Sequence, residues 1–288
     1  MRVLVTGASG FIGSQLVPAL VASDHDVHAV VRAGGWVDNL RDATIVEADL
    51  ARPLDRGSLP VVDAVVHLAQ ANVPFPDAAR ELYLVNTLST QDLLEYARQI
   101  GARRFVLASS GSIYGLGEAA VTEEEPRRAT DFYAVTKRNA EQLVEAYGDF
   151  ISTAVLRPFT PYGPAQHGRL ISSLISRVRE DVPVTLNEGG RPRITPIFID
   201  DLIRMIVGAV ELEGHEVVNL AGDEVASIRD VALLIGDALE REVRFERGGT
   251  ATGDLVADNA HMHAVFAPGS LVPLTDGIRV AALAKALA

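Results

Sequence analysis

The sequence predicts an α/β fold in which a doubly wound parallel sheet, with helices on both faces, is joined to a smaller, discontinuous C-terminal α/β lobe. Short apolar runs alternate with helical patterns through the first half of the chain, as in parallel sheets closed by right-handed crossovers. A glycine-rich turn joins the first expected strand to the first helix. With 288 residues, 48% of them hydrophobic, the chain can bury a large core.

The strands of the main sheet are expected in short runs of aliphatic and β-branched residues. They lie at residues 3–5, 27–31, 44–46, 64–68, 105–108 and 153–156. Helical patterns follow Gly13 and cover residues 83–99, ending at the cap residue Gly101, and residues 131–146. Ligands of such sheets bind beyond the carboxyl ends of the strands, so the glycine turn and the residues after position 108 should share one crevice.

Beyond residue 157 the pattern breaks into pieces rich in proline and glycine. Later segments alternate helix and strand again, at residues 169–179, 197–202, 217–220, 228–239 and 243–245. The chain is therefore expected to leave the first sheet, return to it near residue 197 and then complete a second lobe.

The glycine-rich turn follows an apolar strand directly and has the spacing G-x-x-G-x-x-G at Gly7, Gly10 and Gly13. Glycines allow the backbone to approach a pyrophosphate closely, and the N-terminus of the next helix attracts its charge. The alternative is a tight turn without a ligand. The position of the glycine turn directly after the first strand favours binding of a dinucleotide.

Tyr133 and Lys137 lie at i and i+4 of an expected helix, so they share a face with Cβ atoms about 5–6 Å apart. A nearby ammonium favours the phenolate and lowers the pKa of a tyrosine. A hydroxyl whose pKa is lowered toward neutral pH suits proton transfer at an alcohol or carbonyl. The alternative is an ordinary Tyr and Lys on a helix surface.

Composition excludes several classes of protein. The net charge of −12 argues against nucleic acid as a partner, because nucleic-acid binding needs a basic footprint. The chain has no cysteine, so disulfides and thiolate metal sites are excluded and a cytoplasmic location is expected. No apolar run is long enough to span a membrane, and the first strand begins too early to leave room for a signal peptide.

These motifs resemble those of the extended short-chain dehydrogenase/reductase family, in particular its nucleotide-sugar epimerases, dehydratases and ketoreductases. Further segments carry the resemblance: H-L-A at residues 67–69, A-S-S-G-S-I-Y-G at 108–115, and L-R-P-F-T-P-Y-G-P at 156–164. The resemblance implies a Rossmann-like domain that binds NAD(P), at residues 1–157 plus about 197–219. It implies a substrate-binding lobe at about 158–196 plus 220–288.

The resemblance also implies the site residues. Ser110, Tyr133 and Lys137 are the expected catalytic residues. Cofactor contacts are expected from Gly7, Ser9, Gly10, Phe11, Ile12, Gly13, Arg32, Asp49, Leu50, Leu68, Ala69, Asn86, Tyr133, Lys137 and Pro158. Substrate contacts are expected from Ser112, Tyr114, Arg193 and Arg247. The arginines suit a diphosphate, although the register around Arg193 departs from the family pattern.

The residue that ends the second strand bears on the choice of cofactor. A carboxylate there would bind the ribose of NAD, whereas Arg32 offers a fork for the 2′-phosphate of NADP. NADP is therefore expected, with NAD possible. Gly111 and Ser112 replace the Asp-Glu pair of family members that dehydrate sugars, which argues against dehydration.

The sequence thus favours an NADPH-dependent ketoreductase acting on a nucleotide-linked deoxysugar. One alternative is an epimerase with tightly bound NAD. A second is a non-catalytic NADP-binding regulator of the same fold. A homodimer is expected by analogy with relatives. No metal site is expected, because His67, His167 and the pair His261 and His263 lie in three regions far apart in sequence and lack neighbouring carboxylates at ligand spacing.

Overall fold

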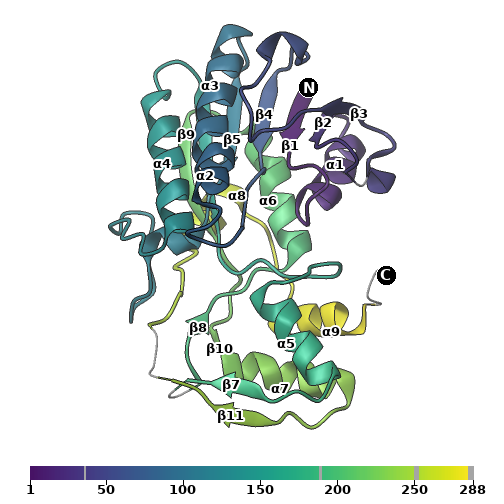
Figure 1. The fold of residues 1–288 in the computed structure, drawn as a ribbon, viewed down its shortest axis with the longest axis vertical. Coiled ribbons are helices and arrows are strands. Elements are labelled where there is room, and N and C mark those ends of the chain that lie inside the picture. Colours follow the sequence, from purple (N-terminus) through teal and green to yellow (C-terminus); the bar gives the residue numbers. More distant parts are fainter. Residues whose placement is uncertain (36, 188–189, 250–252, 285–288) are drawn as a thin grey trace. The chain divides into compact units, whose positions relative to one another are not determined.

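The computed structural model describes residues 1–35, 37–187, 190–249 and 253–284. A seven-stranded sheet has the strand order β3-β2-β1-β4-β5-β6-β9 (Figure 1). Its strands are β1 Arg2–Thr6, β2 Asp26–Val31, β3 Thr44–Glu47, β4 Ala64–His67, β5 Arg104–Ala108, β6 Ser152–Pro158 and β9 His215–Leu220. Strands β1 to β6 pair in parallel, which confirms the expected doubly wound α/β sheet.

Helices connect these strands. They are α1 Gly13–Ala22, α2 Ala79–Tyr83, α3 Ser89–Gln99, α4 Phe132–Ala146 and α6 Ile199–Glu211. Short 3-10 turns lie at Asp38–Leu40, Arg56–Ser58 and Gly111–Tyr114. Helix α4 begins where the sequence predicts, because the Asp131 side chain caps it by accepting a hydrogen bond from the Ala134 N–H.

The helix expected at residues 83–99 differs from the prediction. It begins earlier, at Ala79, and a π-helical turn at Leu84–Leu88 (η3) separates α2 from α3. The sequence analysis treated residues 83–99 as one regular helix, whereas the extra residue of the π-helical turn changes the phase of α2 relative to α3. Asn86 lies within this turn, and its buried amide binds groups outside the helix.

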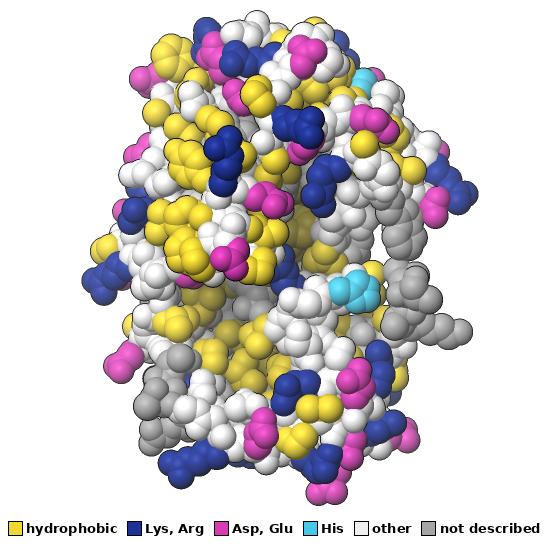
Figure 2. Space-filling view, viewed as in Figure 1, with side chains coloured by type: hydrophobic (Ala, Val, Ile, Leu, Met, Phe, Trp, Pro, Cys, Tyr) yellow, Lys and Arg dark blue, Asp and Glu magenta, His cyan; other side chains and the backbone are white. Residues whose placement is uncertain are grey.

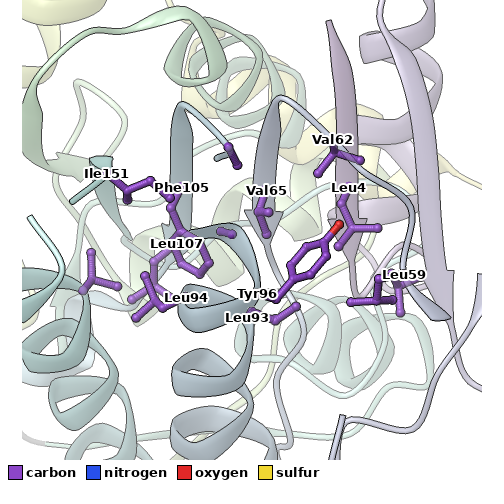
Figure 3. Packing of buried hydrophobic residues seen from close by; sticks show 14 of the residues in the cluster. Leu4, Leu59, Val62, Val65, Leu93, Leu94, Tyr96, Phe105, Leu107 and Ile151 are labelled. Atoms are coloured by element: carbon purple, nitrogen blue, oxygen red, sulfur yellow. The ribbon is translucent and has the colours of Figure 1, made fainter. Parts of the chain in front are cut away.

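The core between the sheet and helices α3 and α4 is aliphatic with few aromatic rings. Tyr96 of α3 lies among Leu4, Leu59 and Val62 (Figure 3). Its hydroxyl donates to the Pro60 carbonyl oxygen, so the one polar atom of the ring is satisfied. Burial raises the pKa of Tyr96 to about 12.

The chain divides into two compact units. The first contains residues 1–113, 127–157 and 203–218, and the second contains residues 114–126, 158–202 and 219–288. The sequence placed residues 114–126 and 197–202 in the first domain, whereas contacts assign them to the second. Within that unit, Gly117 forms a β-bridge with Asp254. Residues 188–189, 250–252 and 285–288 of the expected lobe lie outside the described residues.

The second unit contains two small sheets and its own helices. Strand β7 Val184–Leu186 pairs in parallel with β11 Phe245–Arg247, and β8 Arg193–Ile194 pairs antiparallel with β10 Ala226–Ser227. The helices are α5 Leu170–Arg179, α7 Ile228–Leu239, α8 Ala260–Phe266 and α9 Leu274–Leu283.

Within the part of the chain that the structure describes, no helix is both long and apolar enough to cross a membrane. Within the same ranges, His, Asp and Glu side chains do not gather in threes as a metal ion would require. On the face seen in Figure 2, basic and acidic side chains are interspersed, in keeping with the absence of a basic footprint in the composition.

Candidate active site at the carboxyl ends of the strands

The glycine turn between β1 and α1 is shaped by close backbone packing. Gly7 has a positive φ of 69°, and a Cβ atom there would lie 2.7 Å from the Ala69 backbone nitrogen. A Cβ atom at Gly13 would lie 2.2 Å from the Gly7 carbonyl oxygen. Glycine is therefore required at both positions, whichever ligand binds.

The start of α1 suits an anion. The residue before the helix, Ile12, has no side chain that could cap its N–H groups, and Ser9 and Gly10 are exposed. Uncapped N–H groups and the helix dipole together attract phosphate. The turn therefore fits the pyrophosphate of a dinucleotide, which the Gly7, Gly10 and Gly13 motif would hold.

The Lys137 ammonium links α4 to the sheet. Its Nζ atom is 2.8 Å from the carbonyl oxygen of Ala108, the last residue of β5, and the side chain is 1% exposed. Burial lowers the pKa of Lys137 to about 8, while the nearby Glu141 carboxylate opposes that effect. The lysine therefore still carries its proton at neutral pH, and the residue it binds, Ala108, lies two positions before Ser110 in the chain.

Ser110 and Ser112 lie together just after β5. Their Oγ atoms are 2.9 Å apart, and the Ser112 N–H donates to the Ser110 Oγ at 3.1 Å. Tyr133 lies in the first turn of α4, half-buried, and its hydroxyl donates to the Gln70 Oε1 at 2.6 Å. The three expected catalytic residues thus belong to the same unit, on β5's exit loop and on α4.

A buried carboxylate that the sequence analysis did not identify lies one turn beyond Lys137. Glu141 accepts hydrogen bonds from the Ser109 Oγ at 2.5 Å and from Arg157 Nε at 3.0 Å and Nη2 at 2.8 Å. Both charged side chains are nearly inaccessible, at 2% and 4% exposure. Arg127 adds a longer contact of 3.4 Å. In the sequence, the position of Glu141 four residues after Lys137 was the one available indication of its role. Its partners Ser109 and Arg157 are too distant in sequence to be recognised.

His67 occupies the end of β4 and is uncharged. Its Nδ1 lies 2.7 Å from the Thr6 Oγ1, and its Nε2 lies 3.1 Å from the Thr90 Oγ1. Burial, and secondarily the Lys137 charge, lower the pKa of His67 to about 3. The ring therefore ties β4 to β1 and α3 as a neutral hydrogen-bonding group.

The remaining expected cofactor residues vary in their surroundings. Arg32 is exposed just beyond β2, and Asp49 forms an ion pair with Arg52 at 3.2 Å. Leu50, Leu68 and Pro158 are buried, Ala69 is half-buried, and Phe11 and Ile12 are half-buried at the start of α1. Asn86 is 1% exposed and binds Ala71 and Thr136.

The expected substrate residues in the second unit make contacts of their own. The Tyr114 hydroxyl donates to the Asn219 Oδ1 at 2.8 Å, and the side chain is 5% exposed. Arg193 pairs with the buried Asp254 at 2.8 Å, and Arg191 approaches the same carboxylate at 3.8 Å. Arg247 is exposed on β11. Roles for these residues in substrate binding stay predictions.

Comparison with known proteins places this geometry among sugar-nucleotide enzymes. The model of the NAD dependent epimerase/dehydratase family matches residues 3–221. A Bacillus subtilis protein, named as an uncharacterised UDP-glucose epimerase, is 30% identical over 88% of this chain and 87% of its own length. A Streptomyces dTDP-4-dehydro-6-deoxy-D-allose reductase is 28% identical over 84% of this chain and 82% of its own.

A solved structure extends the similarity to nearly the whole chain. UDP-glucuronic acid 4-epimerase from Bacillus cereus, in complex with UDP-glucuronic acid and NAD, superimposes with a TM-score of 0.89. The two sequences are 29% identical, and the match covers 98% of each chain. The fold is therefore that of UDP-sugar epimerases.

Replacement of Gly13 by Ala tests the packing of the glycine turn. The added methyl group would meet the Gly7 carbonyl oxygen, so we expect Gly13→Ala to lower the free energy of unfolding by about 1–3 kcal/mol. Gly117→Ala is the control, because a Cβ atom there meets nothing within 4 Å. Urea denaturation measures both. Equal stability of the two variants would contradict the packing argument.

Replacement of His67 by Gln tests its neutral state. As pH falls from 6.5 toward about 3, the unfolded chain takes up a proton that folded His67 refuses. The free energy of unfolding should therefore fall by up to about 1.4 kcal/mol per pH unit in that window, and His67→Gln should lack this component. Above pH 6.5 His67 causes no pH dependence of the free energy of unfolding, because it is neutral in both the folded and the unfolded chain. Denaturant titrations across pH measure it, and parallel profiles would refute it.

Replacement of Glu141 tests the buried ion pair. Glu141→Leu leaves the Arg157 charge buried without its carboxylate, so we expect a loss of about 3–5 kcal/mol in the free energy of unfolding. Addition of Arg157→Met should restore part of that loss. Glu145→Leu on the same helix is the control, since Glu145 is 71% exposed, and its effect should stay within about 0.5 kcal/mol.

Proposed function

Because this chain belongs to the NAD dependent epimerase/dehydratase family, we propose that it is a nucleotide-sugar 4-epimerase that acts on a UDP-linked hexose with tightly held NAD. The observation that carries the proposal is the bond between Lys137 on α4 and the last residue of β5. It sets the Tyr133 helix against the strand end that carries Ser110. Proton-transfer groups at a strand end suit chemistry on an alcohol beside a dinucleotide.

The residues of this chain have distinct roles in the proposed reaction. NAD, when bound, would accept a hydride from the sugar carbon and later return it. Tyr133 would take the proton of the sugar hydroxyl and later return it to the same oxygen, and the carbon would be inverted because the hydride comes back to its opposite face. Lys137 would stabilise the ionised Tyr133, and Ser110 would donate a hydrogen bond to the reacting oxygen.

The comparisons support an epimerase over the ketoreductase that the sequence favoured. The similar structure from Bacillus cereus is a 4-epimerase with NAD, and the Bacillus subtilis relative bears an epimerase name. Arg32 and the Streptomyces reductase support the second candidate, an NADPH-dependent ketoreductase. A homodimer, a cytoplasmic location and diphosphate contacts from Arg193 and Arg247 remain predictions.

Cofactor content and substrate conversion separate the two candidates. An epimerase should release NAD when the purified protein is denatured. It should also interconvert UDP-glucose or UDP-glucuronic acid with its C4 epimer when no dinucleotide is added. Release of NADP, or consumption of added NADPH with a 4-keto sugar nucleotide, would instead favour the ketoreductase. Chromatography of the extract and of the sugar nucleotides measures both.

Tyr133→Phe tests the proton-transfer role. Removal of the hydroxyl should lower kcat by about 10²–10⁴-fold, because a positioned acid-base group contributes that much. The retained NAD and the urea midpoint should not change. Tyr147→Phe, just beyond the far end of α4, removes a hydroxyl bonded to Glu95 and should keep full turnover. A Tyr133→Phe enzyme with most of its activity would refute the assignment.

A further inference from the structure

The loop that follows β4 is attached to the beginning of α4 at three points. The Tyr133 hydroxyl donates to the Gln70 Oε1 at 2.6 Å. Asn86 joins Ala71 to Thr136 of α4. The Phe75 ring stacks on the Phe132 ring, with centroids 4.8 Å apart and planes 19° from parallel. Phe132 and Tyr133 of α4 therefore contact the loop directly, and Thr136 is joined to it through Asn86.

Asn86 fixes the backbone next to Gln70. Its Oδ1 accepts from the Ala71 N–H at 2.7 Å, and its Nδ2 donates to the Ala71 carbonyl oxygen at 3.1 Å. The same Nδ2 donates to the Thr136 Oγ1 at 3.1 Å. Because Asn86 is 1% exposed, these bonds are shielded from water, and they hold the Gln70 main chain at a set distance from α4.

We propose that Gln70 is a positioning residue for Tyr133, which holds the tyrosine oxygen in both its protonated and its ionised state. This inference rests on the proposed function for its catalytic meaning. A primary amide carries an acceptor and a donor at the same end. The Gln70 Oε1 meets the phenol, and a half-turn of the amide presents Nε2 to the phenolate. The tyrosine oxygen then stays in place as its proton leaves and returns.

Other side chains of similar size cannot do this. A carboxylate at position 70 would accept from the phenol but repel the phenolate, and a thioether would bind neither form well. The ionisable side chains on these elements include Asp131, whose carboxylate caps α4, Lys137 on the same helix, and His67 at the end of β4. His67 is uncharged, so Lys137 supplies the positive charge near the tyrosine.

The direct test is the ionisation of Tyr133, followed by phenolate absorbance during a pH titration. The chain contains 6 tyrosines. The contribution of Tyr133 is therefore isolated by subtracting the titration curve of the same protein with Tyr133→Phe added. We expect Gln70→Glu to raise the midpoint of this difference titration by at least about half a pH unit. Gln99→Glu, on the exposed side of α3, is the control and should leave the midpoint unchanged. An unchanged midpoint in Gln70→Glu overturns the proposal.

Turnover supplies the second measurement. Gln70→Met should lower kcat roughly 2- to 12-fold, as expected for the loss of one ordinary hydrogen bond, with KM for the sugar nucleotide within about twofold. Gln70→Asn keeps the amide and should recover part of kcat, whereas Gln99→Met should match the wild type. Full kcat in Gln70→Met overturns the proposal.

The two measurements also separate this proposal from the proposed function. If the wild-type protein converts no UDP-sugar yet Gln70→Glu shifts the titration, the 4-epimerase assignment fails and the link between Gln70 and Tyr133 stands. If the wild-type protein is an epimerase and neither Gln70 variant differs from it, the role of Gln70 fails alone.

Discussion

The buried carboxylate of Glu141 is the interaction on which the arrangement of the candidate site depends. It accepts from Ser109 and from Arg157, so it joins α4 to the ends of β5 and β6 at one point. Lys137 adds a second bond from α4 to β5 one helical turn away. Two strands and a helix are thereby held in fixed positions, and the Ser110 and Tyr133 that they carry belong to the same unit.

This arrangement also determines the balance of charge. Lys137 and Arg157 are buried cations, and Glu141 is the buried anion that faces both. Desolvation lowers the pKa of Lys137, and the carboxylate limits that effect, so the lysine remains mostly protonated near neutral pH. The neutral state of His67 avoids a further cation nearby. An ammonium kept charged inside a protein acts on its neighbours more strongly than one in water.

Much of the fold could be predicted from the sequence because its signals are local. The apolar runs of the sheet, the glycine turn and the capped helix at residue 131 each depend on neighbouring residues only. The π-helical turn, the Asn86 contacts and the Arg193–Asp254 pair could not be predicted in this way. Asn86 binds residues 15 and 50 positions away, and Arg193 binds one 61 positions away, so only the folded chain brings these partners together. Gln70 was missed for the same reason, since it is 63 residues from Tyr133.

The π-helical turn at Leu84–Leu88 has weaker backbone hydrogen bonds than a regular α-helix, but it keeps the geometry of the site. Deletion of one residue there would let the segment relax into a regular α-helix with better backbone hydrogen bonds. The same deletion would rotate the preceding side chains by about 100° relative to α3, because each residue turns a helix by that angle. Asn86 would then face away from Ala71, and the Gln70 loop would lose its anchor. The wider π-helical turn thus orients the Asn86 side chain. In this orientation its amide can bind the loop at Ala71 and helix α4 at Thr136 at the same time.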